Sequence, residues 1–138
     1  MIKDRNNIPK LLENLKKAGK ESVQVGVFNP DVATYAAANE FGVPSKNIPE
    51  RSFIRMTLDK KEVQEKCRNA LEPLFDVNEN PMQALDKVAV ILTAEVKRTM
   101  TTAEYKPNAP ETIKRKGPGK NPLYDTGTLQ KSIMAKVV

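Results

Sequence analysis

The sequence contains no histidine, no tryptophan and only one cysteine, Cys67, among its 138 residues. Without histidine the chain lacks the commonest general base and the commonest metal ligand, which removes most hydrolase active sites. A single cysteine excludes an internal disulfide. Aromatic residues make up 5% of the chain, which leaves little surface on which single-stranded nucleic acid could stack. We therefore expect no enzymatic activity, no cofactor and no metal site.

Long apolar runs are also missing, because no stretch approaches the roughly 20 residues that cross a bilayer. The first ten residues, MIKDRNNIPK, lack the apolar segment of a signal peptide. Hydrophobic residues make up 39% of the sequence, which at this length is enough for one core and too little for two. We expect a single domain over residues 1–138 that does not enter a membrane.

Positive charge is concentrated near the C-terminus. Residues 1–96 contain 14 Lys+Arg and 14 Asp+Glu, whereas residues 97–138 contain 9 and 3, so the second segment carries the whole net charge of +6. A basic segment of this kind can contact DNA phosphates, an acidic protein surface or only water. Composition leaves these three possibilities open.

Hydrophobic periodicity predicts three elements in the first third of the chain. An amphipathic helix is expected over residues 7–19, with Ile8, Leu11, Leu12, Leu15 and Ala18 on its buried face. Alternation over residues 22–28 predicts a strand. Asp31 is placed to cap a following helix over 32–40, which Gly42 ends and whose alanines permit close approach of a neighbouring element.

The central part predicts two long helices. The first is expected to run from about Ser52 to Pro73, with one break in its apolar pattern at Lys60. The second is capped by Asn80 and begins at Pro81, and its buried side carries Met82, Leu85, Val88, Ala89, Leu92 and Val96. Two long helices this close in sequence are expected to pack as an antiparallel pair.

Alternating residues at 132–138 predict a second strand, expected to pair with the strand at 22–28. The fold class is therefore α+β: a small antiparallel sheet packed with the pair of long helices and one or two shorter helices. A two-stranded sheet has exposed edges, so either helices cover one face or neighbouring subunits extend the sheet.

A long loop containing proline and glycine is expected at about 102–122, with one possible helical turn at 111–116. Its glycines do not form a phosphate-binding loop, because Pro118 removes a backbone donor and no Lys-Ser/Thr pair opens a helix there. A basic cluster on a loop can still neutralise DNA backbone without reading sequence. The candidate DNA- or partner-facing residues are Lys106, Lys114, Arg115, Lys116 and Lys120.

Two other groups of polar residues have ordinary structural explanations. The carboxylates Glu62, Glu65, Glu72 and Asp76 are interleaved with lysines and arginine, which is typical of a solvated helix face rather than of a metal site. Cys67 falls on the apolar face of the same helix and has no histidine to activate it, so burial is favoured over nucleophilic use. The triplet Asp125-Thr126-Gly127 occurs once, whereas an aspartic protease needs two such carboxylates, and it predicts a turn.

Five segments together resemble a known family. In this order and spacing they are similar to the tail-component, tail-completion or virion-morphogenesis proteins of tailed bacteriophages, small proteins of the neck region at the head-to-tail junction. The resemblance extends from about residue 20 to the C-terminus and departs at Ser52, where the family often has proline. The segments are VQVGVF (23–28), TYAAANEFGV (34–43), IPERSFIR (48–55), APETIKRKG (109–117) and NPLYDTGTLQKSI (121–133).

The resemblance implies a structural virion protein, assembled in the host cytoplasm, that forms a closed ring around the DNA conduit. Its partners would be further copies of the chain, a neck connector, and tail tube or terminator proteins. Sixfold symmetry of the ring is expected, because it would have to fit the symmetry of a tail tube. Glu40-Phe41-Gly42 is expected to end its helix with an aromatic anchor, while residues 48–51 fix the next loop. The candidate assembly residues are Glu40, Phe41, Gly42, Pro49, Arg51, Phe53, Asp125, Thr126 and Gly127.

Two functions from other classes remain alternatives. A small non-specific binder of double-stranded DNA would use the same basic loop and would show a steep salt dependence. A metal-dependent nuclease would use the helix carboxylates and would cleave DNA when magnesium is added, which we do not expect.

Overall fold

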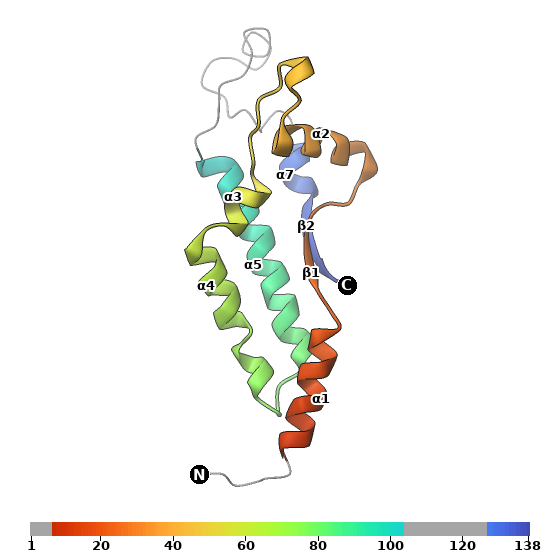
Figure 1. The fold of residues 1–138 in the computed structure, drawn as a ribbon, viewed down its shortest axis with the longest axis vertical. Coiled ribbons are helices and arrows are strands. Elements are labelled where there is room, and N and C mark those ends of the chain that lie inside the picture. Colours follow the sequence, from red (N-terminus) through yellow and green to blue (C-terminus); the bar gives the residue numbers. More distant parts are fainter. Residues whose placement is uncertain (1–6, 104–126) are drawn as a thin grey trace.

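The computed structural model describes residues 7–103 and 127–138. The molecule is elongated, and a single helix, α5 (Pro81–Thr102), runs along its long axis (Figure 1). Strand β1 (Val23–Val27) pairs antiparallel with β2 (Ile133–Val137), with Val25 opposite Ala135. Helix α5 packs against both strands, so one face of the sheet is covered. The predicted α+β class and the pairing of the two strands are confirmed.

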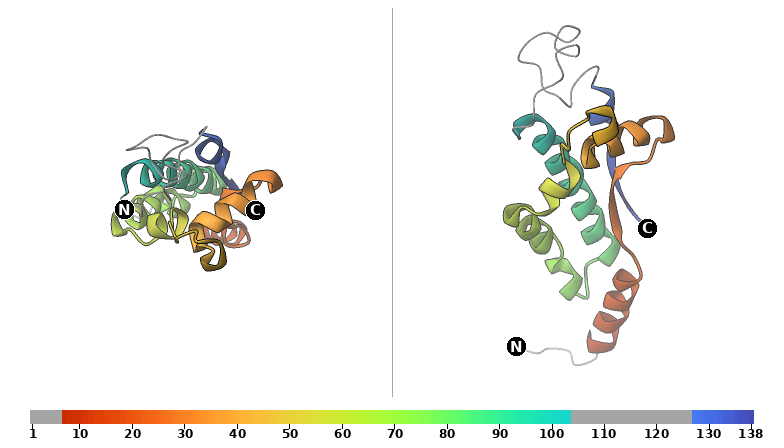
Figure 2. Two further views of the ribbon diagram at one scale, coloured as in Figure 1. Left: turned by 90° about the horizontal axis from the view of Figure 1, so that it is seen from above. Right: turned by 45° about the horizontal axis from the view of Figure 1, so that its top comes forward.

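The remaining elements lie around α5. Helix α1 (Asn7–Gly19) lies at one end of the long axis, and α2 (Pro30–Phe41) lies toward the other (Figures 1 and 2). Helices α3 (Ile54–Leu58) and α4 (Lys61–Ala70) pack on α5, with α4 antiparallel to it. The short elements are η1 (Pro44–Lys46), η2 (Glu72–Phe75) and α7 (Thr128–Ser132).

The long helix predicted from Ser52 to Pro73 is wrong, because the chain breaks at Asp59 and Lys60 into α3 and α4. Lys60 has an extended backbone, with ψ at 123°, and its ammonium group donates to the hydroxyl of Thr99 on α5 at 3.0 Å. In a continuous helix this lysine would lie on the apolar face. The break lets its charged end reach a polar partner.

Helix α5 confirms the second predicted helix. Asn80 caps it by accepting from the N–H of Met82 at 3.0 Å, and Pro81 occupies its first position. It continues to Thr102, and residues 104–122 of the predicted loop lie outside the described residues. Most of its expected apolar face is buried, and Met82 is half-buried; the buried members are Leu85, Val88, Ala89, Leu92 and Val96.

Two hydrophobic clusters form the core along α5. The lower one contains Val63, Val88 and Leu92, and Cys67 packs against it. Burial, followed by the nearby Glu95 carboxylate, raises the pKa of the Cys67 thiol, which disfavours the reactive thiolate. The Glu95 carboxylate also accepts from the Lys66 ammonium at 2.6 Å, joining α4 to α5.

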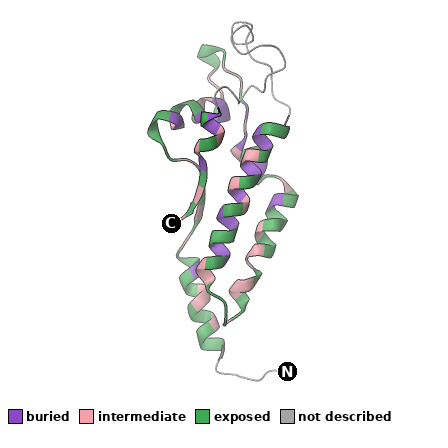
Figure 3. Cartoon of the chain, turned by 180° about the vertical axis from the view of Figure 1, so that it is seen from behind, coloured by how far each residue is buried: buried purple, intermediate pink, exposed green. Residues whose placement is uncertain are grey.

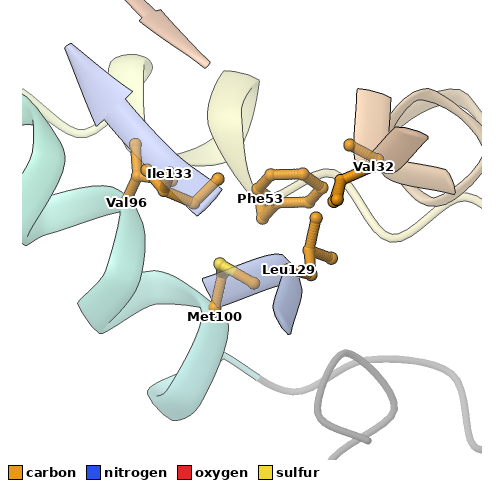
Figure 4. Packing of buried hydrophobic residues seen from close by; sticks show 7 residues of the cluster. Val32, Phe53, Val96, Met100, Leu129 and Ile133 are labelled. Atoms are coloured by element: carbon orange, nitrogen blue, oxygen red, sulfur yellow. The ribbon is translucent and has the colours of Figure 1, made fainter. Parts of the chain in front are cut away.

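The upper cluster lies where α2, α3, α5, α7 and the sheet meet. Phe53 is fully buried at its centre, among side chains from α2, α5, α7 and β2 (Figure 4). Helix α7, which the sequence did not predict as a helix, adds Leu129 to this cluster. The full set is Val32, Ala36, Phe53, Val96, Met100, Leu129 and Ile133, with Val25, Val27 and Ile54 packed against it.

Helix α1 differs from its prediction. Among its described side chains Ala18 alone is buried, whereas Ile8 is 60% exposed and Leu12 is 51% exposed. Figure 3 shows this helix as mostly exposed. Its remaining apolar residues, Leu11 and Leu15, are half-buried, so α1 attaches to the body through only part of the apolar face that the sequence shows.

Candidate functional site

The buried carboxylate of Glu40, at the end of α2, accepts four hydrogen bonds. It faces the start of α3, which has no capping side chain at its N-cap residue Phe53. The Ser52 hydroxyl donates to one Glu40 oxygen at 2.7 Å, and the Phe53 N–H donates to the other at 2.8 Å. The N–H groups of Ile54 and Arg55 donate at 2.9 and 3.0 Å.

This arrangement, which we call the Glu40 junction (Glu40 with residues 52–55), supplies a helix cap from a distant segment. The first N–H groups of a helix have no partner within the helix, and a negative charge there is favoured by the helix dipole. Burial of the carboxyl raises its pKa, but the N–H groups of Ile54 and Arg55, the Ser52 hydroxyl and the Phe53 N–H outweigh burial. The pKa of Glu40 is therefore held below its ordinary value.

Gly42 allows the chain to fold back onto the same segment. Its φ is +72°, and a Cβ at this position would lie 2.8 Å from the Glu50 nitrogen. Val43 and Ile48 form an isolated β-bridge just beyond it. Only glycine satisfies both the backbone conformation and this close approach. The glycine that ends α2 therefore also lets the loop that contains Pro49 pack against the end of the helix.

Arg51 completes the connection between the two segments. Its N–H donates to the Asn39 carbonyl at 2.6 Å, and the residue is 6% exposed. Burial lowers the pKa of the guanidinium, and the interaction with Tyr35 acts in the opposite direction. The end of α2 is thus hydrogen-bonded to residues 51–55 through the Asn39 carbonyl and the Glu40 carboxylate. Gly42, just after α2, lies close to the Glu50 backbone.

The predicted aromatic anchor at Phe41 is wrong. Phe41 is 68% exposed, whereas Phe53, twelve positions later, is 0% exposed and fills the upper cluster. The buried face of α2 consists of Val32, Ala36, Asn39 and Glu40, and Phe41 falls outside it. Phe41 instead lines an apolar groove of about 410 Å³ between α2 and α3.

The groove, which we call the α2–α3 groove, has a floor of small and aliphatic side chains. Its wall on α2 is formed largely by alanines, at the positions where the sequence predicted close approach of a neighbour. No described segment of the chain fills it. The lining residues are Val27, Ala33, Ala36, Ala37, Glu40, Phe41, Ile54, Arg55, Leu58 and Asp59.

The third group of candidate residues is only partly described. Gly127 has a φ of +79° and is the N-cap residue of α7. Asp125 and Thr126 lie outside the described residues, as does the basic cluster of Lys106, Lys114, Arg115, Lys116 and Lys120.

The segments of the resemblance that the structure describes meet in one place. VQVGVF supplies Val25 and Val27, TYAAANEFGV supplies Ala36, and IPERSFIR supplies Phe53 to the upper cluster. The described end of NPLYDTGTLQKSI adds Leu129. The described parts of these segments therefore pack into one unit, with the Glu40 junction beside it.

Comparisons with known proteins find no match: no family model, no curated protein and no solved structure matches the chain. Within residues 7–103 and 127–138, every helix is too short or too polar to cross a bilayer. Across the same ranges, no three His, Cys, Asp or Glu side chains are grouped closely enough to hold a metal ion.

Proposed function

We propose that this chain is a structural protein of the head-to-tail junction of a tailed bacteriophage, a neck or tail-completion protein that forms a ring around the DNA conduit. The observation that carries the proposal is the meeting of the family-like segments in the upper cluster and at the Glu40 junction. Segments that are far apart in the sequence thus pack into one folded unit, and this packing is what supports the proposal.

The function is mechanical: the ring joins head to tail, seals the junction and lets DNA pass. Ring assembly uses heterologous contacts, in which one face of a subunit meets a different face of the next. The basic residues between 106 and 120 supply positive charge for DNA phosphates or for an acidic neighbour such as a connector or tube protein. Contacts to phosphates alone carry no sequence information.

Electron microscopy of particles assembled with and without the chain tests the role directly. We expect particles lacking it to accumulate as separate heads and tails, and labelled protein to lie at the neck. Normal infectious particles without the chain would overturn the proposal.

Salt-titrated binding to duplex DNA separates the ring protein from the alternative, a small non-specific DNA-binding protein. A protein that binds DNA tightly with a steep salt slope, and that never forms rings, would favour the alternative. Replacing Lys114, Arg115 and Lys116 with alanine should change the free energy of unfolding by no more than about 0.5 kcal/mol, the range of exposed substitutions. The same variant then isolates the contribution of charge to DNA binding or to assembly.

A further inference from the structure

The outer edge of β2 carries backbone groups that no other strand of the described chain pairs with. The sheet has two strands, and β1 occupies one side of β2. Ser22 and Val138 exchange two hydrogen bonds, at 2.7 and 2.8 Å, and in an antiparallel sheet such bonded pairs alternate along the strands. The N–H and C=O groups of Ala135 and Val137 therefore point away from β1. An edge of this kind is a template for a further strand.

Helix α5 presents an open face beside that edge. A groove of about 380 Å³ lies between Ala135 and the helix. Val90, in its lining, is 70% exposed. Figure 3 shows exposed residues along α5 as the molecule is seen from behind. The helix residues that line the groove are Ala89, Val90, Thr93, Ala94 and Lys97.

This face of α5 is complementary to itself. Four of its residues, at intervals of four, three and four, form one line along the helix: Asp86, Val90, Thr93 and Lys97. Asp86 and Val90 are exposed, and the other two are half-buried. Because the intervals are the same in both directions, an antiparallel second copy places Asp86 opposite Lys97. The same register places Val90 opposite Thr93.

The two charges on this line have no ion-pair partner in their own subunit. Within residues 7–103 and 127–138, the ion pairs involve neither Asp86 nor Lys97. Eleven residues, about 16 Å of helix, separate these two side chains, so they cannot pair with each other. A second copy supplies each of them with a partner of opposite charge on the same face as the exposed Val90.

Strand β2 is complementary to itself about the same place. An antiparallel second β2 centred on Ala135 places Ile133 opposite Val137, and the two Ala135 residues then bond through their outward N–H and C=O groups. Lys136 lies opposite Met134, so like charges do not face each other. Ala135 borders the groove with residues 89–97 of α5. The midpoint of the helix line falls within that range, so one twofold axis can pass through both contacts.

We propose that two copies of the chain associate about a twofold axis at Ala135. Their β2 strands join into one continuous sheet, and their α5 helices pack antiparallel on one face of it. The contact is isologous, because both copies contribute the same surface. Burial of Val90 and the bonds of the strand edge supply the attraction, while the pairs of Asp86 with Lys97 set the register. The proposed ring uses heterologous contacts, so this dimer goes beyond that function and does not depend on it.

Substitution of the exposed apolar side chain tests the helix contact. Val90→Asp changes a residue that is 70% exposed, so the monomer should keep its fold by circular dichroism. We expect the dimer dissociation constant from sedimentation equilibrium to rise about tenfold or more, because apolar burial is lost and a charge is desolvated. Ile8→Asp, at a 60% exposed position on α1, is the matched control and should change it little. A chain that stays monomeric, or a Val90→Asp variant that dimerises like the wild type, would overturn the proposal.

Charge reversal tests the antiparallel register. Asp86→Lys brings two ammonium groups together across the axis, and Lys97→Asp brings two carboxylates together, so each variant alone should dimerise several-fold more weakly. Mixing the two variants restores opposite charges at both positions, and we expect heterodimers with nearly the wild-type dissociation constant. Asp86→Lys mixed with Arg98→Asp, which lies off the line, is the control and should recover little. A mixture no tighter than its separate components would show that the contact is wrong.

Amide hydrogen exchange tests the strand contact. The Ala135 N–H points to the free edge, whereas Lys136, paired with Gln24, belongs to a bonded pair within the subunit. Between dilute monomer and concentrated dimer we expect exchange of the Ala135 amide to slow about tenfold or more, and that of Lys136 to change less. Equal exchange of Ala135 in monomer and dimer would overturn the joined sheet.

The outcomes separate the dimer from the proposed function. A dimer that passes these tests, in a protein whose absence leaves heads and tails joined, would support the interface and overturn the neck role. A neck protein that is monomeric in solution at all concentrations would overturn the interface and leave the neck role standing.

Discussion

The Glu40 junction and helix α1 lie toward opposite ends of the molecule and are held in opposite ways (Figure 1). At the junction, a buried carboxylate accepts four hydrogen bonds beside the fully buried Phe53. In α1, Ile8 and Leu12 keep more than half of their surface exposed. One end is therefore fixed by hydrogen bonds within the subunit, while the other keeps apolar surface exposed.

The largest expected effect is the loss of the aromatic ring at the centre of the upper cluster. Phe53→Ala should lower the free energy of unfolding by about 4 kcal/mol, the cost of a large buried cavity. Phe75→Ala removes the same atoms from a side chain that is 72% exposed and should cost about 0.5 kcal/mol or less. Urea denaturation of both variants checks the contrast, and equal costs would contradict the packing described above.

Glu40→Gln keeps the shape of the side chain but removes its charge and replaces one acceptor oxygen with a donor. We expect a loss of about 2 kcal/mol, because buried N–H groups at the start of α3 are left without an acceptor. Glu13→Gln, in the exposed ion pair of α1 with Lys17, is the matched control and should stay within about 0.5 kcal/mol. Denaturant unfolding at neutral pH measures both; a small loss for Glu40→Gln would show that the cap contributes little.

The stabilisation from Glu40 should also depend on pH. Because its folded pKa is lowered, the contribution is fully present above the ordinary glutamate pKa and is lost as pH falls through the lower folded value. The difference in unfolding free energy between wild type and Glu40→Gln should therefore shrink on acidification. Denaturation at a series of pH values checks this, and a difference that grows toward acid would contradict the sign.

The same Gly→Ala substitution can be compared near the two ends of the molecule, at Gly42 beside the Glu40 junction and at Gly19 in α1. Gly42→Ala places a Cβ against the Glu50 backbone at a φ of +72°, whereas a Cβ at Gly19, the last residue of α1, meets nothing within 4 Å. We expect Gly42→Ala to cost about 2 kcal/mol and Gly19→Ala to be neutral or slightly stabilising. Thermal unfolding distinguishes them, and similar shifts would remove the contrast.

The smallest effect is expected at the exposed apolar residues of α1. Leu12→Ala should change the unfolding free energy of the monomer by no more than about 0.5 kcal/mol, while Leu129→Ala, in the upper cluster, should cost about 3 kcal/mol. Unfolding is measured at several protein concentrations, because any self-association would add to the apparent stability. A large loss for Leu12→Ala in the monomer would mean that α1 is held within its own subunit.

Local signals made much of the fold predictable. The strands follow from alternation, and Asn80 with Pro81 marks the start of α5 correctly. The predicted cap of α2 at Asp31 is wrong. Asn29 caps this helix instead, and its side chain accepts from the Asp31 N–H at 3.0 Å. Both residue types cap helices well, so local chemistry alone does not choose between them.

The Glu40 junction was missed because its partners lie 12 to 15 positions away. One signal was present: Glu40 falls four residues after Ala36 and eight after Val32, on the buried face of α2. A charged residue at an apolar position needs a buried partner. The periodicity of the sequence placed that charge on the buried face. It could not identify its hydrogen-bond partners, the N–H groups of residues 53–55 at the start of α3.

The pairing of β1 with β2 has a consequence for synthesis of the protein. It joins residues from near the two ends of the described chain, and such long-range pairing is slow because a large loop must first be closed. The sheet and the Phe53 cluster can form only after Ile133 has emerged from the ribosome. A translation product that ends before Ile133 therefore leaves Val25 and Val27 without their partners in the sheet and in the Phe53 cluster.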